Sequence, residues 1–342
     1  MENIFTGLIP DPRIEEQKQK DYQHDEMYSA LPIQWKEKTE FRQFPIRNQN
    51  GSGMCVAFST AKVLGVNNSN ENKEFATLSP RYIYVQRTDK NSSGMYLQKA
   101  GDIAIKSGSC LDTSMPSDNL PESQANNDTD KTAEVDSEAF KYRGKTYVFI
   151  NNDANVMDNI ATIIEKGYAL VLTTRFHFSE WNDEPQIKVP TDQANNFHAI
   201  TIVDYFIKNG EKCLLMEDSW GQQYGNNGRR ILSETWIRSR MTGCMYIIDI
   251  ESTQIEKPKY NFTQVMIYGQ KSYHIIALQD VLKYEGFLPS NIDSTGFYGN
   301  LTAKAVLSWQ RWHNIAPESE LLALEGKRCG YKTLACLNQL YA

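Results

Sequence analysis

Three residues far apart in this chain have the types that nucleophilic catalysis needs. Cys55 stands where the apolar run VAFSTAKVLGV begins, which is typical of a buried helix, and a helix N-terminus favours the thiolate form of a cysteine. His198 lies within the strand-like run NNFHAITIV, where a sheet would hold its ring rigidly as a base. Asp218, in MEDSWGQQYGNNG, could accept a hydrogen bond from the other ring nitrogen and orient the imidazole.

A fourth residue, Gln49, stands six positions before Cys55. Its side-chain amide could donate a hydrogen bond to a developing oxyanion, as could the backbone N–H of Cys55. Each signal is weak alone, because a cysteine near a helix start is more often a buried thiol and a strand histidine more often a core residue. The combination of the four residues, in this order, is what favours a cysteine nucleophile with a histidine base.

The spelling around these residues resembles that of papain-like cysteine peptidases. The matching segments are LPIQWKEKTEFRQFPIRNQ, QNGSGMCVAFS, SSGMYLQKAGDIAIKSG, NFHAITIVDY and EDSWGQQYGNNGRRIL. The resemblance implies that Gln49 is the oxyanion donor, Cys55 the nucleophile and His198 the base and later acid. The spelling is most similar to bacterial or phage members.

The same resemblance assigns substrate contacts and marks two departures. Ser93 and Gly94 would offer main-chain hydrogen bonds to an extended substrate, and Trp220 would shield the imidazole from water. Asp218 stands where the family usually has asparagine, and a carboxylate stabilises an imidazolium more strongly than an amide does. Ser52 stands where many relatives have a disulfide cysteine.

The segments that must position these residues change along the chain from helical to strand-like sequence patterns. Residues 56–66, 79–88 and 94–108 are predicted to be helices, with Gly108 ending the last, and 111–138 a polar surface excursion. A further helix is predicted at 155–167. Short β-branched and aromatic runs then predict an antiparallel sheet or barrel: 147–151, 168–176, 197–206, 213–218, 229–233 and 245–250. The predicted class is α+β, a papain-like fold of a helical lobe and an antiparallel β lobe.

Four parts are predicted along the chain. Residues 1–30 form an N-terminal arm, 31–255 the peptidase-like domain, 256–264 a linker, and 265–342 a small all-α domain of three amphipathic helices. The last part has a core that includes Leu278, Val281, Leu282, Ala305, Val306 and Trp309. Its spelling resembles the peptidoglycan-binding domain found beside many cell-wall enzymes. The alternative is that this domain only packs against the peptidase or a partner protein.

Composition excludes several classes of function. There are 36 Lys and Arg against 42 Asp and Glu, a formal charge of −6, so nothing favours nucleic acid or an anionic membrane as a partner. No apolar stretch approaches the ~18 residues of a membrane span. His274 and His313 lack ligand spacing, so no metal is predicted, and no cofactor. If one of the six cysteines is catalytic, the other five cannot all pair, so no disulfide framework is implied.

The first residues lack the pattern of a secretory signal. The sequence therefore predicts a monomer that is cytoplasmic, or that is released by a route it does not encode, such as lysis or a virion, to act at the cell envelope.

The function expected from these features is that of a cysteine endopeptidase with a Cys55 thiolate and His198 imidazolium. It would act on a protein or a peptide, and residues 265–342 would direct it to cell-wall material. One alternative is a catalytically inactive papain-like scaffold that binds cell wall or protein. Another is a transglutaminase-like acyl-transferring enzyme, which also uses Cys, His and Asp.

Overall fold

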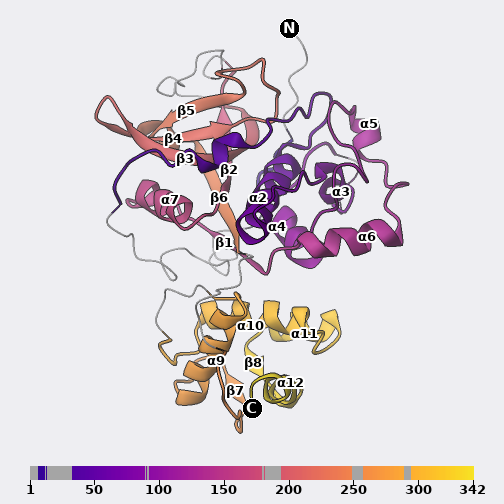
Figure 1. Ribbon diagram of the computed structural model, residues 1–342, viewed down its shortest axis with the longest axis vertical. Helices are drawn as coiled ribbons and strands as arrows, with labels where there is room; N and C mark the ends of the chain where they lie inside the picture. The colour runs from indigo at the N-terminus through magenta and orange to yellow at the C-terminus, as the bar shows by residue number, and fades with distance from the viewer. Residues whose placement is uncertain are drawn as a thin grey trace. The chain divides into compact units, whose positions relative to one another are not determined.

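The computed structural model describes residues 7–11, 13, 33–88, 90, 92–178, 181, 194–248, 257–288 and 294–342. These residues form two compact units, one ending at Ile247 and the other beginning at Ile248. The first unit holds every residue for which the sequence predicts a catalytic role, and the second holds the C-terminal helices (Figure 1).

Helices make up the first half of the first unit. They are η2 (Glu40–Gln43), α2 (Cys55–Asn72), α3 (Pro80–Tyr84), α4 (Leu97–Lys106), α5 (Glu122–Ala125), α6 (Ala133–Ala139) and η3 (Phe140–Tyr142). The helices expected near 56–66, 79–88 and 94–108 are thus present. Gly108 follows α4 with a φ of 72°, a left-handed conformation that glycine adopts at low cost, so it ends this helix as the sequence predicts.

The long helix α2 is buried along most of its length. Its side chains from Cys55 to Ala61 are all buried, as are those of Val63, Leu64 and Val66. A helix that is buried on all faces needs neighbours on all sides, and α2 packs against α3 and α4 as well as against the sheet (Figure 1). Its first residue is therefore held at a fixed place beside the strands.

Six strands form one sheet in the order β1-β6-β2-β3-β4-β5. Their bounds are β1 (Thr146–Phe149), β2 (Leu170–Phe176), β3 (Asn196–Lys208), β4 (Glu211–Glu217), β5 (Arg229–Ser233) and β6 (Met241–Ile248). The pairs β2–β3, β2–β6, β3–β4 and β4–β5 are antiparallel, as expected. Asn209 and Gly210 connect β3 to β4 with φ values of 52° and 81°, the positive pair that a tight two-residue hairpin requires.

The helices of the β half include one that the sequence did not reveal. Helix α7 (Val156–Glu165) lies where it was predicted, whereas α8 (Glu234–Arg240) was missed. Ser233 caps α8 by accepting a hydrogen bond from the Trp236 N–H. The segment 111–138, predicted as a polar surface excursion, is largely exposed, and it contains α5 and most of α6. These three helices have at most seven residues, too few to show a helical period.

The second unit has its own hydrophobic core. Its elements are β7 (Met266–Ile267), α9 (Tyr273–Tyr284), α10 (Asn300–Trp312), α11 (Glu318–Leu324), β8 (Arg328–Cys329) and α12 (Tyr331–Tyr341). The expectation of three helices and no strands therefore needs correction. Helix α11 was missed because it buries a single residue, Leu321, and so shows no apolar period. Strands β7 and β8 were missed because two residues are too few to show alternation. The predicted core residues are all buried: Leu278, Val281, Leu282, Ala305, Val306 and Trp309.

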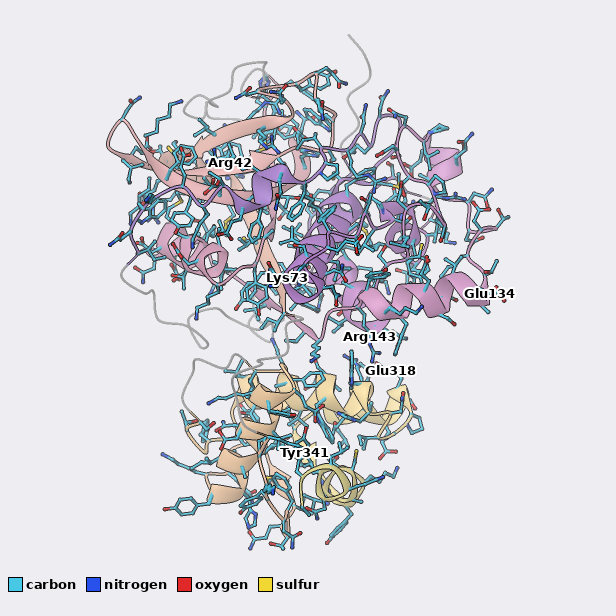
Figure 2. The ribbon with its side chains drawn as sticks, viewed as in Figure 1. Arg42, Lys73, Glu134, Arg143, Glu318 and Tyr341 are labelled. Atoms are coloured by element: carbon cyan, nitrogen blue, oxygen red, sulfur yellow. The ribbon has the colours of Figure 1, made fainter. Side chains whose placement is uncertain are left out.

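A partly buried carboxylate ties the helices of the second unit together. Glu285 accepts hydrogen bonds from Trp309 Nε1 at 2.8 Å, from His313 Nε2 at 2.6 Å and from the hydroxyl of Tyr341, which Figure 2 labels near the end of α12. His313 therefore has a structural partner. Within the predicted linker, the Tyr260 N–H donates to the Tyr341 carbonyl and Phe262 is buried, so this stretch packs into the second unit.

Candidate active site

Cys55 is the first residue of α2, and the loop before it is closed by hydrogen bonds. The Gln49 carbonyl accepts from the N–H and the hydroxyl of Ser52, at 3.0 and 2.9 Å. The first helical bond runs from the Phe58 N–H to the Met54 carbonyl. The N–H groups of the first turn, that of Cys55 included, lack helical acceptors and can stabilise negative charge beside the thiol.

His198 enters the site from β3, where its backbone is paired with Thr174 of β2. Its Nε2 lies 2.8 Å from Asp218 Oδ1, and both side chains are fully buried. The other ring nitrogen, Nδ1, is buried and makes no hydrogen bond of ordinary geometry with the described residues. Cys55 is nevertheless close enough to act on the imidazole through charge and a polar contact. A long thiol–imidazole contact is common in a resting enzyme and tightens when substrate binds.

The protonation of this pair follows from its surroundings. Burial by itself would lower the pKa of His198, but the negative charges of Asp218 and Cys55, with their hydrogen bonds, outweigh burial and raise it to about 9. Burial likewise would raise the pKa of Asp218, but His198 and Arg230 hold it below its ordinary value. Near neutral pH the site therefore contains an imidazolium and a carboxylate.

Asp218 follows β4 and receives four hydrogen bonds. Its Oδ1 accepts from His198 Nε2 and from the Ser219 N–H, both at 2.8 Å. Its Oδ2 accepts from Trp181 Nε1 at 2.8 Å and from Arg230 Nη1 at 2.9 Å. A carboxylate with both oxygens satisfied in this way cannot rotate without losing bonds, so it fixes the orientation of the imidazole.

Aromatic rings cover the imidazole. The Trp220 ring centroid lies 4.7 Å from that of His198 with 31° between the ring planes. Trp181 approaches edge-on at 6.0 Å, and Phe176 lies at 6.1 Å. All three aromatic side chains are buried. They keep water from the His198–Asp218 pair, and charge interactions are stronger where water is excluded.

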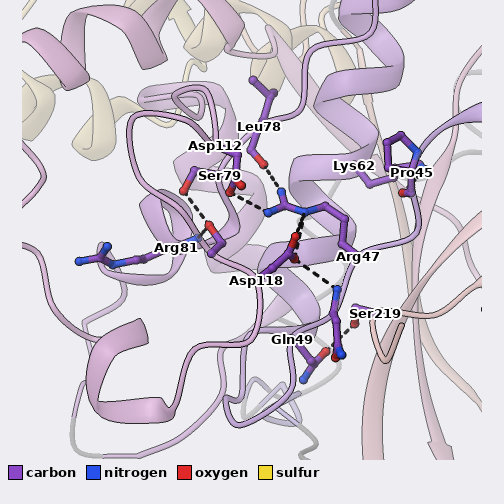
Figure 3. A network of polar contacts seen from close by, with 12 residues as sticks. Pro45, Arg47, Gln49, Lys62, Leu78, Ser79, Arg81, Asp112, Asp118 and Ser219 are labelled. Atoms are coloured by element: carbon purple, nitrogen blue, oxygen red, sulfur yellow. Dashed lines mark hydrogen bonds and ion pairs between the residues drawn. The ribbon is translucent and has the colours of Figure 1, made fainter. Parts of the chain in front are cut away.

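Gln49 joins the nucleophile loop to the segment that follows Asp218. Its Nε2 donates to the Ser52 carbonyl at 2.9 Å. Figure 3 shows its other contact, in which the Ser219 hydroxyl donates to Gln49 Oε1. Its backbone N–H donates to the Ser219 carbonyl at 2.7 Å, and Asn48 forms a β-bridge with Trp220. The amide of Gln49 is therefore held in place from both ends.

Arg47 anchors the same loop to the helical half. It pairs with Asp112 at 2.7 Å and Asp118 at 3.1 Å, and its Nη1 donates to the Leu78 carbonyl at 2.7 Å (Figure 3). A pocket lined by Arg47, Lys62 and Asp218, among other residues, does not include Cys55 or His198 among its lining residues. Lys62 pairs with Glu217 at 2.8 Å, so the charges of this pocket are matched within the chain.

The main chain around Gly94 is engaged in a way that the sequence did not indicate. The Gly94 N–H donates to the Tyr84 hydroxyl at 2.7 Å. The next residue, Met95, pairs with the N-terminal arm: its N–H donates to the Gly7 carbonyl at 2.8 Å, and its carbonyl accepts from the Ile9 N–H at 3.1 Å. Met95 thus offers one donor and one acceptor to an extended chain.

The arm passes very close to the nucleophile loop. A Cβ added at Gly7 would lie 1.7 Å from the Gly53 carbonyl oxygen, and one added at Gly94 would lie 2.4 Å from the Gly7 carbonyl oxygen. No side chain fits in either place. Residues 7–9 therefore lie beside Gly53, two positions before Cys55, and beside the segment from Gly94 to Met95.

Glu122, in α5, links these two segments. Its Oε2 accepts from the Gly53 N–H at 2.7 Å and from the Ser93 hydroxyl at 3.2 Å. Its Oε1 accepts from the Tyr84 hydroxyl at 2.7 Å and from Arg87 at 3.2 Å. Through these hydrogen bonds the carboxylate connects the nucleophile loop to the Ser93–Gly94 turn.

The structure brings Gln49, Cys55, His198, Asp218 and Trp220 together, and places Ser93 and Gly94 beside Gly53. Sequence reasoning missed three residues. Trp181 and Glu122 had no signal, because each comes from a polar stretch that shows no period. Arg230 stands in the quoted segment EDSWGQQYGNNGRRIL, and a buried partner for the unusual Asp218 could have been sought there.

The sequence predicts neither a metal site nor a membrane span, and the structure bears on both only for the residues it describes. Within it, no three His, Cys, Asp or Glu side chains gather as metal ligands would. No helix among the described residues combines the length and apolar character of a membrane span.

Comparison with known proteins places this chain in a family. The sequence profile of the family described as "Papain family cysteine protease" matches residues 31–241, more than half of the chain. Caricain from Carica papaya is 24% identical over 224 residues, which are 65% of this chain and 61% of that protein. Cathepsin K from Mus musculus is 24% identical over 244 residues, 67% of this chain and 68% of that protein.

A solved structure shares the fold. The crystal structure of xylellain, a cysteine protease from Xylella fastidiosa, matches with a TM-score of 0.57 and 17% identity, covering 72% of this chain and 96% of that one. At this identity the likeness shows the fold, a papain-like arrangement of helices and antiparallel sheet.

Proposed function

The chain belongs to the papain family of cysteine proteases, and from this premise we propose that it hydrolyses peptide bonds with Cys55 as nucleophile and His198 as base. The observation that carries the proposal is the buried His198–Asp218 pair, with 2.8 Å between Nε2 and Oδ1, beside a cysteine at the N-terminus of α2. The family match supports the reaction class, and these contacts support the choice of residues.

Acylation begins with attack of the Cys55 thiolate on the carbonyl carbon of the scissile bond. The oxyanion that forms would accept hydrogen bonds from the Cys55 N–H and from the Gln49 side-chain amide. The Nε2 of the same amide donates to the Ser52 carbonyl, which holds the amide in place. The His198 imidazolium gives its proton to the leaving nitrogen, the C–N bond breaks, and a thioester remains on Cys55.

Deacylation uses the same groups in reverse. Neutral His198 takes a proton from water as the water oxygen attacks the thioester carbonyl. Collapse of the second oxyanion breaks the C–S bond, releases the carboxylic acid and restores the thiolate and the imidazolium. Asp218 keeps the ring in place through both steps, and Trp220 and Trp181 limit the access of bulk water to it.

The substrate main chain would run along the segment from Ser93 to Met95. The contacts of the arm support this path, since Met95 already pairs through its N–H and carbonyl with Gly7 and Ile9. We propose that Met95 makes the corresponding bonds to a peptide, while Ser93 and Gly94 shape the wall beside it. A protein or peptide is the substrate class that such pairing fits.

The second unit is proposed to direct the enzyme to peptidoglycan. The support is the resemblance of residues 265–342 to peptidoglycan-binding domains, together with Tyr273 and Tyr331, whose rings are exposed and could stack on sugar. Sedimentation of the full chain with insoluble peptidoglycan tests this. Binding that weakens in Tyr273→Ala and Tyr331→Ala supports the proposal, and an absence of binding contradicts it.

The reaction is tested with fluorogenic peptides and with hydroxylamine as an added acceptor. Release of free acid by the wild type, lost in Cys55→Ala, supports a hydrolase. Preferential transfer of the acyl group to an amine at low amine concentration would favour the acyl-transferring alternative. Activity that persists in Cys55→Ala would contradict the assignment of the nucleophile, and no turnover of any peptide would favour the inactive scaffold.

A further inference from the structure

The carboxylate of Asp218 places a charge where the resemblance to papain-like peptidases implies a neutral asparagine. It is fully buried together with His198. A buried charge is costly unless a partner of opposite sign compensates it, and the loss of one partner from a buried pair is strongly destabilising. The imidazolium alone cannot meet this need throughout the reaction, because His198 is neutral during deacylation.

Arg230 supplies a second, permanent positive charge. It lies in β5, opposite Met216 of β4, and its Nη1 is 2.9 Å from Asp218 Oδ2, with both side chains 0% exposed. Its guanidinium also lies 5.6 Å from the centre of the Trp181 ring, whose Nε1 binds the same carboxylate oxygen. Asp218 therefore has His198 on one oxygen and Arg230 on the other.

Other charged groups near this segment are paired elsewhere. Glu217, next to Asp218, binds Lys62 at 2.8 Å and Arg229 at 2.8 Å. Cys55 lies on the helix that packs against β3. With a Cys55 thiolate and a His198 imidazolium, Asp218 and Arg230 bring the sum of charges in the buried site to zero.

We propose that Asp218 and Arg230 act as one unit that replaces the neutral asparagine of relatives, with Arg230 as a positioning residue. Arg230 keeps the carboxylate ionised and aimed at His198 whether the imidazole is charged or neutral. The inference rests on the proposed function, because it concerns the same reaction. It also makes a claim about the folded state that does not depend on turnover.

The unit predicts that the effects of substituting Asp218 and Arg230 are not additive, and that the second substitution partly reverses the loss caused by the first. Asp218→Asn alone leaves the Arg230 guanidinium buried beside a neutral amide, so the melting temperature and kcat/KM should both fall. Asp218→Asn with Arg230→Met restores a neutral arrangement. The double variant should recover at least tenfold in kcat/KM over Asp218→Asn and should melt at a higher temperature.

The pH profile separates positioning from packing. Arg230→Met removes the competing cation, so Asp218 acts on His198 alone and the basic limb of kcat/KM should move to higher pH. Arg230→Lys keeps the charge and should keep the limb in place, which also covers the case in which Arg230→Met folds poorly. Arg229→Met is the matched control, because Arg229 pairs with Glu217 and should show no coupling to Asp218→Asn.

Additive losses in melting temperature and kcat/KM, with the same basic limb in every variant, would overturn the inference. Failure of the proposed function has a different signature, namely activity that survives Cys55→Ala. In that event the melting temperatures of the wild type, Asp218→Asn, Arg230→Met and the double variant still decide the inference. Coupling between positions 218 and 230 upholds the unit, and additive changes overturn it.

Discussion

His198 and Asp218 form a buried pair in which Nε2 and Oδ1 are 2.8 Å apart and neither side chain is exposed. The two residues come from different parts of the sheet, β3 and the loop after β4, and the antiparallel pairing of β3 with β4 sets their separation. Because the backbone fixes both partners, the imidazole is oriented before any substrate binds, which is what a base in acyl transfer requires.

The raised pKa of His198 predicts a pH-dependent contribution to stability. Its pKa is about 9 in the folded protein against 6.5 for an unperturbed histidine, so the folded state binds the proton more tightly. This contribution is fully present below the unfolded pKa and is lost as the pH rises through about 9. The difference in unfolding free energy between wild type and His198→Gln should therefore be larger at pH 6 than at pH 10. A difference that stays constant over this range would contradict the assignment.

Gln49→Ala should slow the chemical step. Removing one oxyanion donor costs about 3 to 4 kcal/mol where it has been measured, so kcat should fall by a factor of about 100 to 1,000 while KM changes little. Ser219→Ala is the control, because it removes the hydroxyl that donates to Gln49 Oε1 but leaves the amide. Its effect on kcat should be clearly smaller. Equal losses in the two variants would indicate that Gln49 acts through packing.

Glu122→Gln should loosen the connection between the nucleophile loop and the Ser93–Gly94 turn. The neutral amide accepts more weakly from the Gly53 N–H, and Arg87 loses a charged partner, so a destabilisation of about 1 to 3 kcal/mol is expected. KM for a peptide should rise more than kcat falls. The exposed Glu134, labelled in Figure 2, gives the control variant Glu134→Gln, which should match the wild type in both measurements.

Gly7→Leu should increase activity on peptides. A side chain at this position would collide with the Gly53 carbonyl, so the arm should leave the segment from Gly94 to Met95 and free its main-chain groups. The measurement is kcat/KM on a peptide substrate, compared with Leu8→Ala, which adds no such collision. Unchanged activity in Gly7→Leu would mean that residues 7–9 do not compete with substrate.

The sequence predicted the helices and strands that carry the site because they are long or strongly patterned. The run after Cys55 and the β-branched run around His198 are both long and mostly apolar, and both elements are present. Helices α5, α6, α8 and α11 were missed since each has at most seven residues. Contacts such as Glu122 with Gly53 or Arg230 with Asp218 join residues from separate elements, so the local sequence pattern around each residue does not predict them.

The central claim is tested most directly by labelling with an epoxysuccinyl inhibitor, followed by mass spectrometry to locate the modified thiol. Burial raises the pKa of Cys110 and of Cys329 to about 12, so these thiols serve as unreactive references in the same chain. We predict selective modification of Cys55 near neutral pH, lost in His198→Ala. Modification without preference for Cys55 over the other five cysteines would contradict a Cys55–His198 catalytic pair.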